Sequence, residues 1–283
     1  MSIDYDPSRV ALYSPERRDT VFVRAMAYSA EQLGVESARL AYLRAETSEA
    51  ERERLTQALT LVEFDTPALF RDSSTGTEAF AAMRFRDGGA LVAFRGTRPD
   101  DVADLATDLR ANAVDWPESA GRVHAGFAAA ARSIMPQLHQ WIEQNKPDLD
   151  KIILTGHSLG AALATLAATL WPAAHLVTLG SPRVGDSAFA ATLSATNIVR
   201  FINCCDVVTE LPPPLGGYVH VRGGTYLTAD GTRVENPTEE LIAQDRRKAR
   251  ADYATRHGWR IGSVLIRDLA DHSPINYVRV LFP

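Results

Sequence analysis

The chain has 283 residues, of which 46% are hydrophobic and 23% are charged, and its formal net charge at pH 7 is −5. A protein of this length buries roughly 75% of the surface that its unfolded chain exposes, so it needs no disulfide or metal to hold a core. The mild acidity argues against a nucleic-acid-binding protein, which would carry a clustered basic face. The composition therefore predicts a soluble globular protein.

Cysteine usage and the first residues bear on the cellular compartment. The only cysteines, Cys204 and Cys205, are neighbours in the sequence. Adjacent cysteines rarely form a disulfide, so no disulfide framework is expected. Residues 1–20 carry charges throughout and lack the apolar stretch of a secretory signal. We therefore expect a cytoplasmic protein.

A long run without Lys, Arg, Asp or Glu extends from Ile152 to Pro182. Its length alone would allow it to cross a bilayer, which takes about 20 predominantly apolar residues. Glycine, serine, histidine and proline residues interrupt it, among them Gly156, Ser158 and Pro172. We expect buried structure in this run and no transmembrane segment.

The first third of the chain has the apolar spacing of helices between about Pro15 and Leu61. The candidate inward positions there are Val21, Met26, Tyr28, Leu33, Leu40 and Leu43. The pattern then changes to alternation from Glu78 to Arg86, followed by a turn and an apolar run from Ala90 to Phe94. This second segment predicts a β-hairpin.

The middle of the chain alternates between helices and strands. The predicted elements are a helix at 126–145, a strand at 151–155, a helix at 159–170, a strand at 176–179, and the further pair 189–193 and 198–203. Strand, helix and strand in succession form a βαβ unit, whose parallel strands are covered on both faces. The predicted fold class is α/β, with a largely parallel sheet.

No repeat or interdomain linker is visible, so we expect a single domain over residues 1–283. Its N-terminal part, about residues 15–61, is helical, and an irregular insertion at about 216–271 carries a charged helix near 238–253. The basic run at 246–250 is interpreted as a solvated helix face, with contact to anionic lipid headgroups as the alternative.

Residues 156–160, Gly-His-Ser-Leu-Gly, fit the pattern G-x-S-x-G between a predicted strand and a predicted helix. The tight turn strains the serine backbone and needs nearly side-chain-free positions two residues before and after it, which Gly156 and Gly160 supply. The helix N-terminus brings backbone N–H groups to where an oxyanion forms in acyl transfer. A phosphate-binding turn is the weaker alternative, because its glycine-rich patterns are absent. Ser158 is the predicted nucleophile.

A serine nucleophile needs a base that is itself oriented by a carboxylate, and in this fold class the order is Ser, Asp, His. His272 lies in a loop before the final helix, where exposure and mobility suit a general base. Asp206 follows a predicted strand at the carboxyl edge of the sheet, where the serine turn also emerges. Asp186 is the rival carboxylate on the adjacent crossover, and Asp206 is preferred.

Six motifs follow one another between Phe94 and Ser273. They are Phe-Arg-Gly-Thr at 94–97, Val-His-Ala-Gly-Phe at 123–127, Thr-Gly-His-Ser-Leu-Gly at 155–160, Leu-Gly-Ser-Pro-Arg-Val-Gly at 179–185, Asp-Val-Val-Thr-Glu-Leu-Pro at 206–212 and Asp-His-Ser at 271–273. With these six motifs in this order, the sequence resembles the class 3 lipases, the fungal-lipase-like family of α/β hydrolases. The resemblance implies the α/β-hydrolase fold, with a mostly parallel central sheet flanked by helices. It also implies the triad Ser158, Asp206 and His272.

The same resemblance implies an oxyanion hole made by the backbone N–H groups of Leu159 and Thr97, with the Thr97 hydroxyl as a further donor. Asp108 either orients Thr97 or faces solvent. A lid is implied over about residues 98–121.

The resemblance also points to an acyl pocket, for which the candidate substrate-binding residues are Val208, Leu211 and Trp116. Thr209 stands where the family usually has proline, a departure that could reshape this pocket.

These residues lead to the hypothesis of a serine carboxylester hydrolase, a lipase or esterase that cleaves acylglycerols and fatty-acid esters through an acyl-enzyme. It needs no cofactor or metal, and its partner is a lipid or small ester, with a lipid–water interface as one setting. Within the same reaction class the alternatives are a phospholipase A1 and an aryl or feruloyl esterase. Outside it, the alternative is a catalytically silent lipase-like binding module. The oligomeric state is not predicted.

Overall fold

A computed structural model describes residues 3–96 and 112–282. In these ranges an eight-stranded sheet has the order β1-β2-β3-β6-β7-β8-β9-β10. Its strands are β1 Ala68–Asp72, β2 Thr77–Arg84, β3 Gly89–Phe94, β6 Ile152–His157, β7 His175–Leu179, β8 Asn197–Asn203, β9 Gly224–Leu227 and β10 Arg233–Glu235. A separate two-stranded sheet pairs β4 Ala113–Asp115 with β5 Arg122–His124.

The strands from β3 through β6, β7 and β8 to β9 run parallel, while β1, β2 and β10 pair antiparallel at the two edges. Every residue of β3 and β6 is buried. Strands covered on both faces carry apolar residues without alternation, which explains the charge-free run of the sequence. The prediction of an α/β fold with a largely parallel sheet is confirmed.

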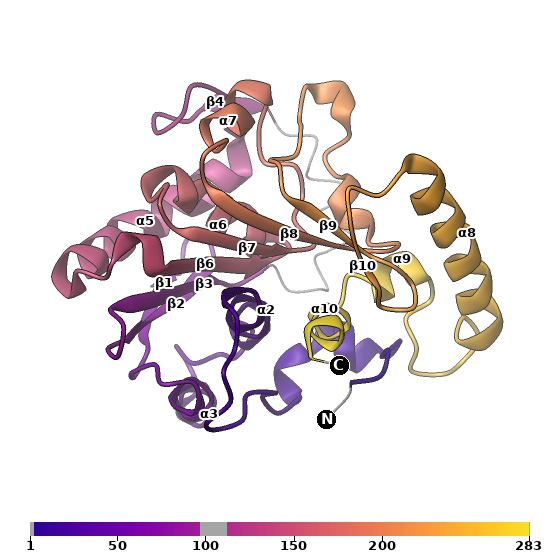
Figure 1. Ribbon diagram of the computed structural model, residues 1–283, viewed down its shortest axis with the longest axis horizontal. Coiled ribbons are helices and arrows are strands. Elements are labelled where there is room, and N and C mark those ends of the chain that lie inside the picture. Colours follow the sequence, from indigo (N-terminus) through magenta and orange to yellow (C-terminus); the bar gives the residue numbers. More distant parts are fainter. Residues whose placement is uncertain (1–2, 97–111, 283) are drawn as a thin grey trace.

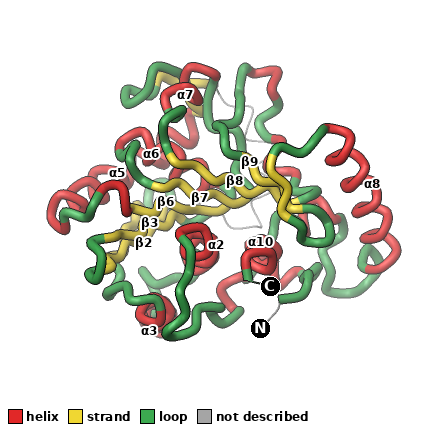
Figure 2. The backbone as a smooth tube through the Cα atoms, viewed as in Figure 1, coloured by secondary structure: helices red, strands yellow, loops and turns green. Residues whose placement is uncertain are grey.

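Helices cover both faces of the sheet (Figures 1 and 2). One face carries α2 Ala30–Leu40, α3 Glu49–Leu61 and α10 Pro274–Leu281, and the other carries α5 Ala125–Asn145, α6 Leu159–Leu170 and α7 Ser187–Thr192. The remaining α-helices are α1 Arg9–Tyr13, α8 Glu239–Arg256 and α9 Arg267–Ala270. Short 3₁₀ turns occupy Pro15–Arg17, Leu149–Lys151, Val207–Glu210 and Pro214–Gly216.

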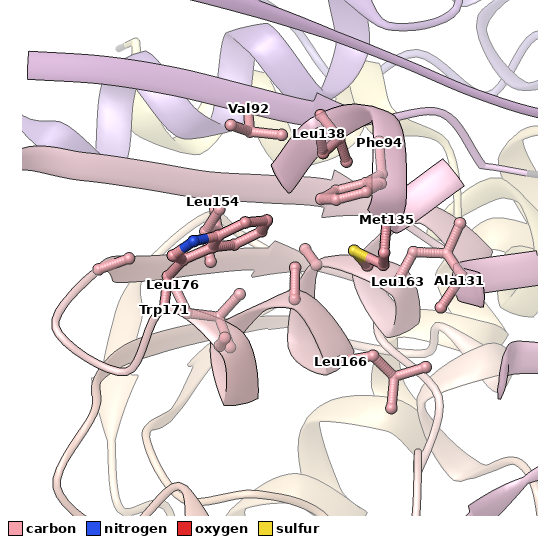
Figure 3. Close-up of a cluster of buried hydrophobic side chains, with 14 of the residues drawn as sticks. Val92, Phe94, Ala131, Met135, Leu138, Leu154, Leu163, Leu166, Trp171 and Leu176 are labelled. Carbon is pink, nitrogen blue, oxygen red and sulfur yellow. The ribbon is translucent and has the colours of Figure 1, made fainter. Parts of the chain in front are cut away.

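Two large apolar cores lie on the two faces of the sheet. Figure 3 shows part of the one beneath α5 and α6, where Phe94 and Leu154 of the sheet meet Leu138 and Leu163 of the helices. The other core joins the sheet to α2, α3 and α10. On that side α2 approaches very closely, since a Cβ at Gly34 would lie 2.8 Å from Val177 Cβ. The βαβ unit that carries the serine is therefore fixed from both faces.

The N-terminal helical region differs from the prediction at its start. Within the predicted span 15–61, α-helix begins only at Ala30, where Ser29 caps α2 in a capping box with Gln32, and Ser48 caps α3. Before α2 the chain turns through Ala25, whose φ is 64°, and Met26 is 57% exposed. Met26 is thus not an inward position.

The segment predicted as an irregular insertion contributes to the sheet. Its β9 pairs in parallel with β8, and β10 closes that edge of the sheet. A four-residue strand directly after Gly223 gives too little apolar pattern to be predicted. The charged helix is confirmed as α8, which packs Ala249 against Cys204, Cys205 and Tyr226.

Within the described ranges, none of the helices combines the length and the apolar content needed to cross a membrane.

Candidate active site

Ser158 lies in the turn between β6 and α6 with φ 58° and ψ −125°, a region that L-residues rarely adopt. The two glycines of the motif face each other in this turn. A Cβ at Gly156 would lie 2.3 Å from the backbone of Gly160, and a Cβ at Gly160 would lie 2.2 Å from the carbonyl oxygen of Phe94. Only glycine fits at both positions, so the sequence pattern and the strained turn have one cause.

The three predicted triad side chains lie in hydrogen-bond contact. His272 Nε2 is 2.9 Å from Ser158 Oγ, and His272 Nδ1 is 2.9 Å from each carboxylate oxygen of Asp206. They come from the β6–α6 turn, the segment after β8 and the segment between α9 and α10. His272, which is 66 positions from Asp206 and 114 from Ser158 in the sequence, thus joins them in one polar chain at the carboxyl edge of the sheet.

The expectation that His272 is exposed and mobile is wrong, because the residue is only 1% exposed. The His157 ring covers it, with ring centroids 4.4 Å apart, and its Nδ1 edge lies against Gly180. Gly180 has φ 56°, and a Cβ there would lie 3.1 Å from His272 Nδ1 and 2.7 Å from Asp206 Oδ2. The geometry of the ring is fixed by packing.

The Asp206 carboxylate accepts two hydrogen bonds besides those from His272. Val208 N–H donates to Oδ1 at 2.9 Å, and the Tyr277 hydroxyl donates to Oδ2 at 2.5 Å. Burial, with the Asp206 charge as the next cause, raises the pKa of Tyr277 well above its usual range, so the phenol keeps its proton. Asn203 N–H in turn donates to the Tyr277 oxygen. Since only donors face this carboxylate, His272 Nδ1 carries a proton and Nε2 is free to accept one from Ser158.

A second pair of side chains holds the main chain of His272. His157 Nε2 is 2.7 Å from the carbonyl oxygen of His272, and His157 Nδ1 is 2.7 Å from the Tyr42 hydroxyl. A carbonyl only accepts, so Nε2 carries the proton of His157 and Tyr42 donates to Nδ1. Burial, and next the neighbouring His272, holds the pKa of His157 well below its usual range. His157 therefore stays neutral beside His272, the predicted base.

Replacing Tyr42 with phenylalanine should lower kcat about tenfold. The variant removes the hydroxyl that donates a hydrogen bond to His157 Nδ1, and leaving this buried nitrogen without a donor costs about 1–3 kcal/mol. KM for a small soluble ester should change little, and the acid limb of the pH–rate profile should shift. Tyr28→Phe is the matched control, because the Tyr28 hydroxyl also makes a hydrogen bond in the N-terminal region, accepting from Val23 N–H, but does not touch His157. Equal kinetics for the two variants would contradict the role of Tyr42.

The buried Asp271 carboxylate joins the two segments that carry Asp206 and His272. The Asp271 carboxylate accepts from Cys205 N–H at 3.0 Å, from Arg267 Nε at 3.0 Å and from the Tyr5 hydroxyl at 2.8 Å. The residue before Asp206 is thus bonded to the residue before His272. Cys204 and Cys205 are both free and buried.

A class 3 lipase family model matches residues 91–216. Over these residues the chain is similar to the class 3, fungal-lipase-like lipases, as its sequence motifs predict. Secreted mono- and diacylglycerol lipase A of Penicillium cyclopium is 34% identical over 171 residues, which is 56% of this chain and 55% of the relative. The chain therefore spans about half the length of the curated relatives it matches.

Solved structures of lipases have the same fold as this chain. Rhizomucor miehei lipase, in a propeptide complex, superposes with a TM-score of 0.60 at 23% identity over 82% of this chain and 84% of that one. A triacylglycerol lipase described as having a serine protease triad as its catalytic centre gives a TM-score of 0.56 at 25% identity, over 70% of this chain and 78% of the other. The α/β-hydrolase fold predicted from the sequence is confirmed.

The relatives contradict the prediction of a cytoplasmic protein. The mono- and diacylglycerol lipase that matches this chain is named as secreted. The prediction rested on the charged residues 1–20 and on the absence of an expected disulfide framework. Neither feature determines the compartment in which a protein of this size acts.

The structure places some of the other predicted site residues and does not describe the rest. Leu159 is the first residue of α6, so its N–H is among those that have no partner inside the helix. Val208 is buried in the turn after Asp206, and Leu211 is half-buried against the core beneath α6. Thr97 and Asp108 lie outside the described residues. The first part of the predicted lid, residues 98–111, does so as well.

Trp116 does not lie beside Ser158, although it was predicted to bind substrate. Its ring is in the core, and Nε1 donates to Thr169 Oγ1 at 2.9 Å near the far end of α6. At 1.5 Å per residue that end is about 16 Å from Ser158. The apolar Trp116 side chain in the predicted lid suggested substrate contact. In the structure this side chain instead anchors the β4–β5 hairpin to the core.

The rival carboxylate Asp186 has a structural role. Its side chain accepts from Phe189 N–H and thereby caps α7, and it also accepts from Arg122 N–H. Sequence reasoning missed the contacts of Tyr42 with His157 and of Tyr277 with Asp206, because each joins elements distant in the chain. Asp271 was noted only as part of the Asp-His-Ser motif, and its pairing with Arg267 was not predicted.

Proposed function

We propose that this protein is a serine carboxylester hydrolase that cleaves acylglycerol and other fatty-acid esters through an acyl-enzyme intermediate. The observation that carries the proposal is the hydrogen-bonded chain from Ser158 through His272 to Asp206, with the serine held in a strained turn at a helix N-terminus. The names of the related lipases support acylglycerols as the substrate class.

In the first step His272 Nε2 takes the proton of Ser158 as Oγ attacks the ester carbonyl carbon. The imidazole becomes a cation, and the Asp206 carboxylate stabilises it through Nδ1–H. The carbonyl oxygen becomes an oxyanion, to which Leu159 N–H donates from the first turn of α6, where the helix dipole adds to its effect. Thr97 is the proposed second donor.

Collapse of the tetrahedral intermediate expels the alcohol, which takes the proton from His272 Nε2, and leaves the acyl group on Ser158. Water then attacks the acyl carbon while His272 again acts as base, releasing the fatty acid and restoring the serine. Val208 and Leu211 are proposed to line the acyl pocket. The reaction as written uses only side chains, backbone N–H groups and water.

The substrate class is tested with p-nitrophenyl esters of increasing chain length, and with triglyceride and phospholipid emulsions. The proposal predicts turnover of acylglycerols and a preference for fatty-acyl over aromatic esters. Preference for phospholipid would identify a phospholipase A1, and preference for aromatic acids would identify an aryl or feruloyl esterase. A folded protein without turnover of any of these esters would contradict the proposal.

A further inference from the structure

The segment between α8 and α9 exposes an unusual set of large apolar side chains. Trp259 is 72% exposed, Ile261 is fully exposed, Leu265 is 69% exposed and Ile266 is 52% exposed. We call residues 257–266 the apolar loop. Large apolar side chains gathered on one surface segment mark a contact with a partner or a membrane.

The exposure is built into the loop by its anchors. Val264 is buried with Leu12 and Tyr253, and its N–H donates to Pro7 O at 2.9 Å. Gly262 O accepts from Arg9 N–H, which ties the loop to α1. With Val264 in the core position, the flanking Leu265 is directed outward. The apolar side chains face solvent because these contacts hold the backbone of the loop. Val10 of α1, which follows the anchored Arg9, is also 52% exposed.

The chemistry of the loop fits an anionic lipid surface. From Tyr253 to Arg267 the sequence contains arginines and no Asp or Glu. Among the described residues, no ion pair holds Arg256 or Arg260. Arg260 lies 5.8 Å from the Trp259 ring centroid, and Trp259 Nε1 donates to Thr255 O, so the polar edge of the indole is already satisfied. Tryptophan beside arginine and aliphatic residues is the composition of segments that insert at the headgroup level.

The position of the loop connects it to the base of the triad. Ile266 is followed directly by α9, and α9 by Asp271 and His272. Figure 1 shows α8 and the chain that follows it on the opposite side of the molecule from α5 and the edge of the sheet formed by β1 and β2. A surface bound by this loop would therefore lie on the His272 side of the fold.

We propose that the apolar loop inserts into anionic lipid–water interfaces and holds the enzyme on them. The inference deepens the proposed function, since it names the surface on which the ester substrate is met. Arg256 and Arg260 contact the headgroups, while Trp259, Ile261 and Leu265 enter the acyl boundary.

Binding is measured without catalysis, using the Ser158→Ala protein and vesicles of phosphatidylcholine with or without phosphatidylglycerol. We expect cosedimentation that strengthens with phosphatidylglycerol and a blue shift of Trp259 emission. Ile261→Asp combined with Leu265→Asp should weaken partitioning at least about tenfold, because carboxylates replace inserted aliphatic chains. Arg256→Gln with Arg260→Gln should remove most of the phosphatidylglycerol dependence. Phe85→Ser is the matched control, because Phe85 is 74% exposed between two arginines at the β2–β3 turn.

Kinetics separate this inference from the proposed function. With Ser158 intact, the Ile261→Asp, Leu265→Asp protein should keep its rate on a soluble p-nitrophenyl ester and lose about tenfold on an emulsified long-chain ester. Unchanged vesicle binding by that protein, or no binding by the parent, would overturn the inference. Self-association that the same substitutions abolish, without vesicle binding, would assign the loop to a second copy of the chain. Absence of all ester turnover would contradict the proposed function while leaving the binding result to stand.

Discussion

Ser158→Ala should lower kcat for a soluble ester by about 10⁴- to 10⁶-fold, because the attacking oxygen is removed and only binding and oxyanion contacts remain. The fold should survive, since among the described residues the Ser158 hydroxyl hydrogen-bonds only to His272, and alanine meets the same backbone cost at φ 58°. Steady-state kinetics and thermal unfolding, measured on the same preparation, check both expectations.

Ser37→Ala is the matched control for this experiment. Ser37 is fully buried in α2, and its hydroxyl has no hydrogen-bond partner among the described residues. Its loss should leave kcat within about twofold of the parent. Retention of near-parent activity by Ser158→Ala would remove the serine from the mechanism.

Asp206→Asn should lower kcat about 10⁴-fold with little loss of structure. Tyr277 O–H and Val208 N–H both donate toward Asp206, so the single acceptor oxygen of asparagine is drawn to them. The amide N–H₂ then faces His272 Nδ1, which must give up its proton to accept the bond. The proton moves to Nε2, and the imidazole can no longer accept one from Ser158. The pH–rate profile on a soluble ester measures the effect.

Asp186→Asn separates this tautomer effect from a general loss of a carboxylate. Asp186 caps α7, and asparagine is an equally good cap, so both stability and kcat should stay near the parent values. If Asp206→Asn matched this control, Asp206 would be structural and another group would orient His272.

The parts of the site that could be predicted are those written in short segments of sequence. Gly156 and Gly160 flank Ser158 because two backbones meet there, and that steric requirement is visible as a five-residue pattern. The βαβ unit around it is equally local, and α6 runs over the residues predicted for it. The positions of Asp206 and His272 then followed from chain order.

The supporting contacts could not be predicted because they join distant elements. Tyr42 lies in the turn after α2 and Tyr277 in α10, and in the sequence alone nothing distinguishes either tyrosine from other residues of a helical region. The burial of His272 was misjudged for the same reason, since the His157 ring that covers it lies more than a hundred positions earlier. Local pattern locates the reacting atoms, whereas packing between elements fixes their orientation.

Covalent labelling tests the central claim most directly. The native chain is incubated with a fluorophosphonate, and the modified residue is located by peptide mass spectrometry. The account predicts one phosphonyl group, carried by Ser158, with labelling lost in Ser158→Ala and strongly slowed in His272→Ala. A folded chain that remains unlabelled, or that carries the label on another residue, would contradict it.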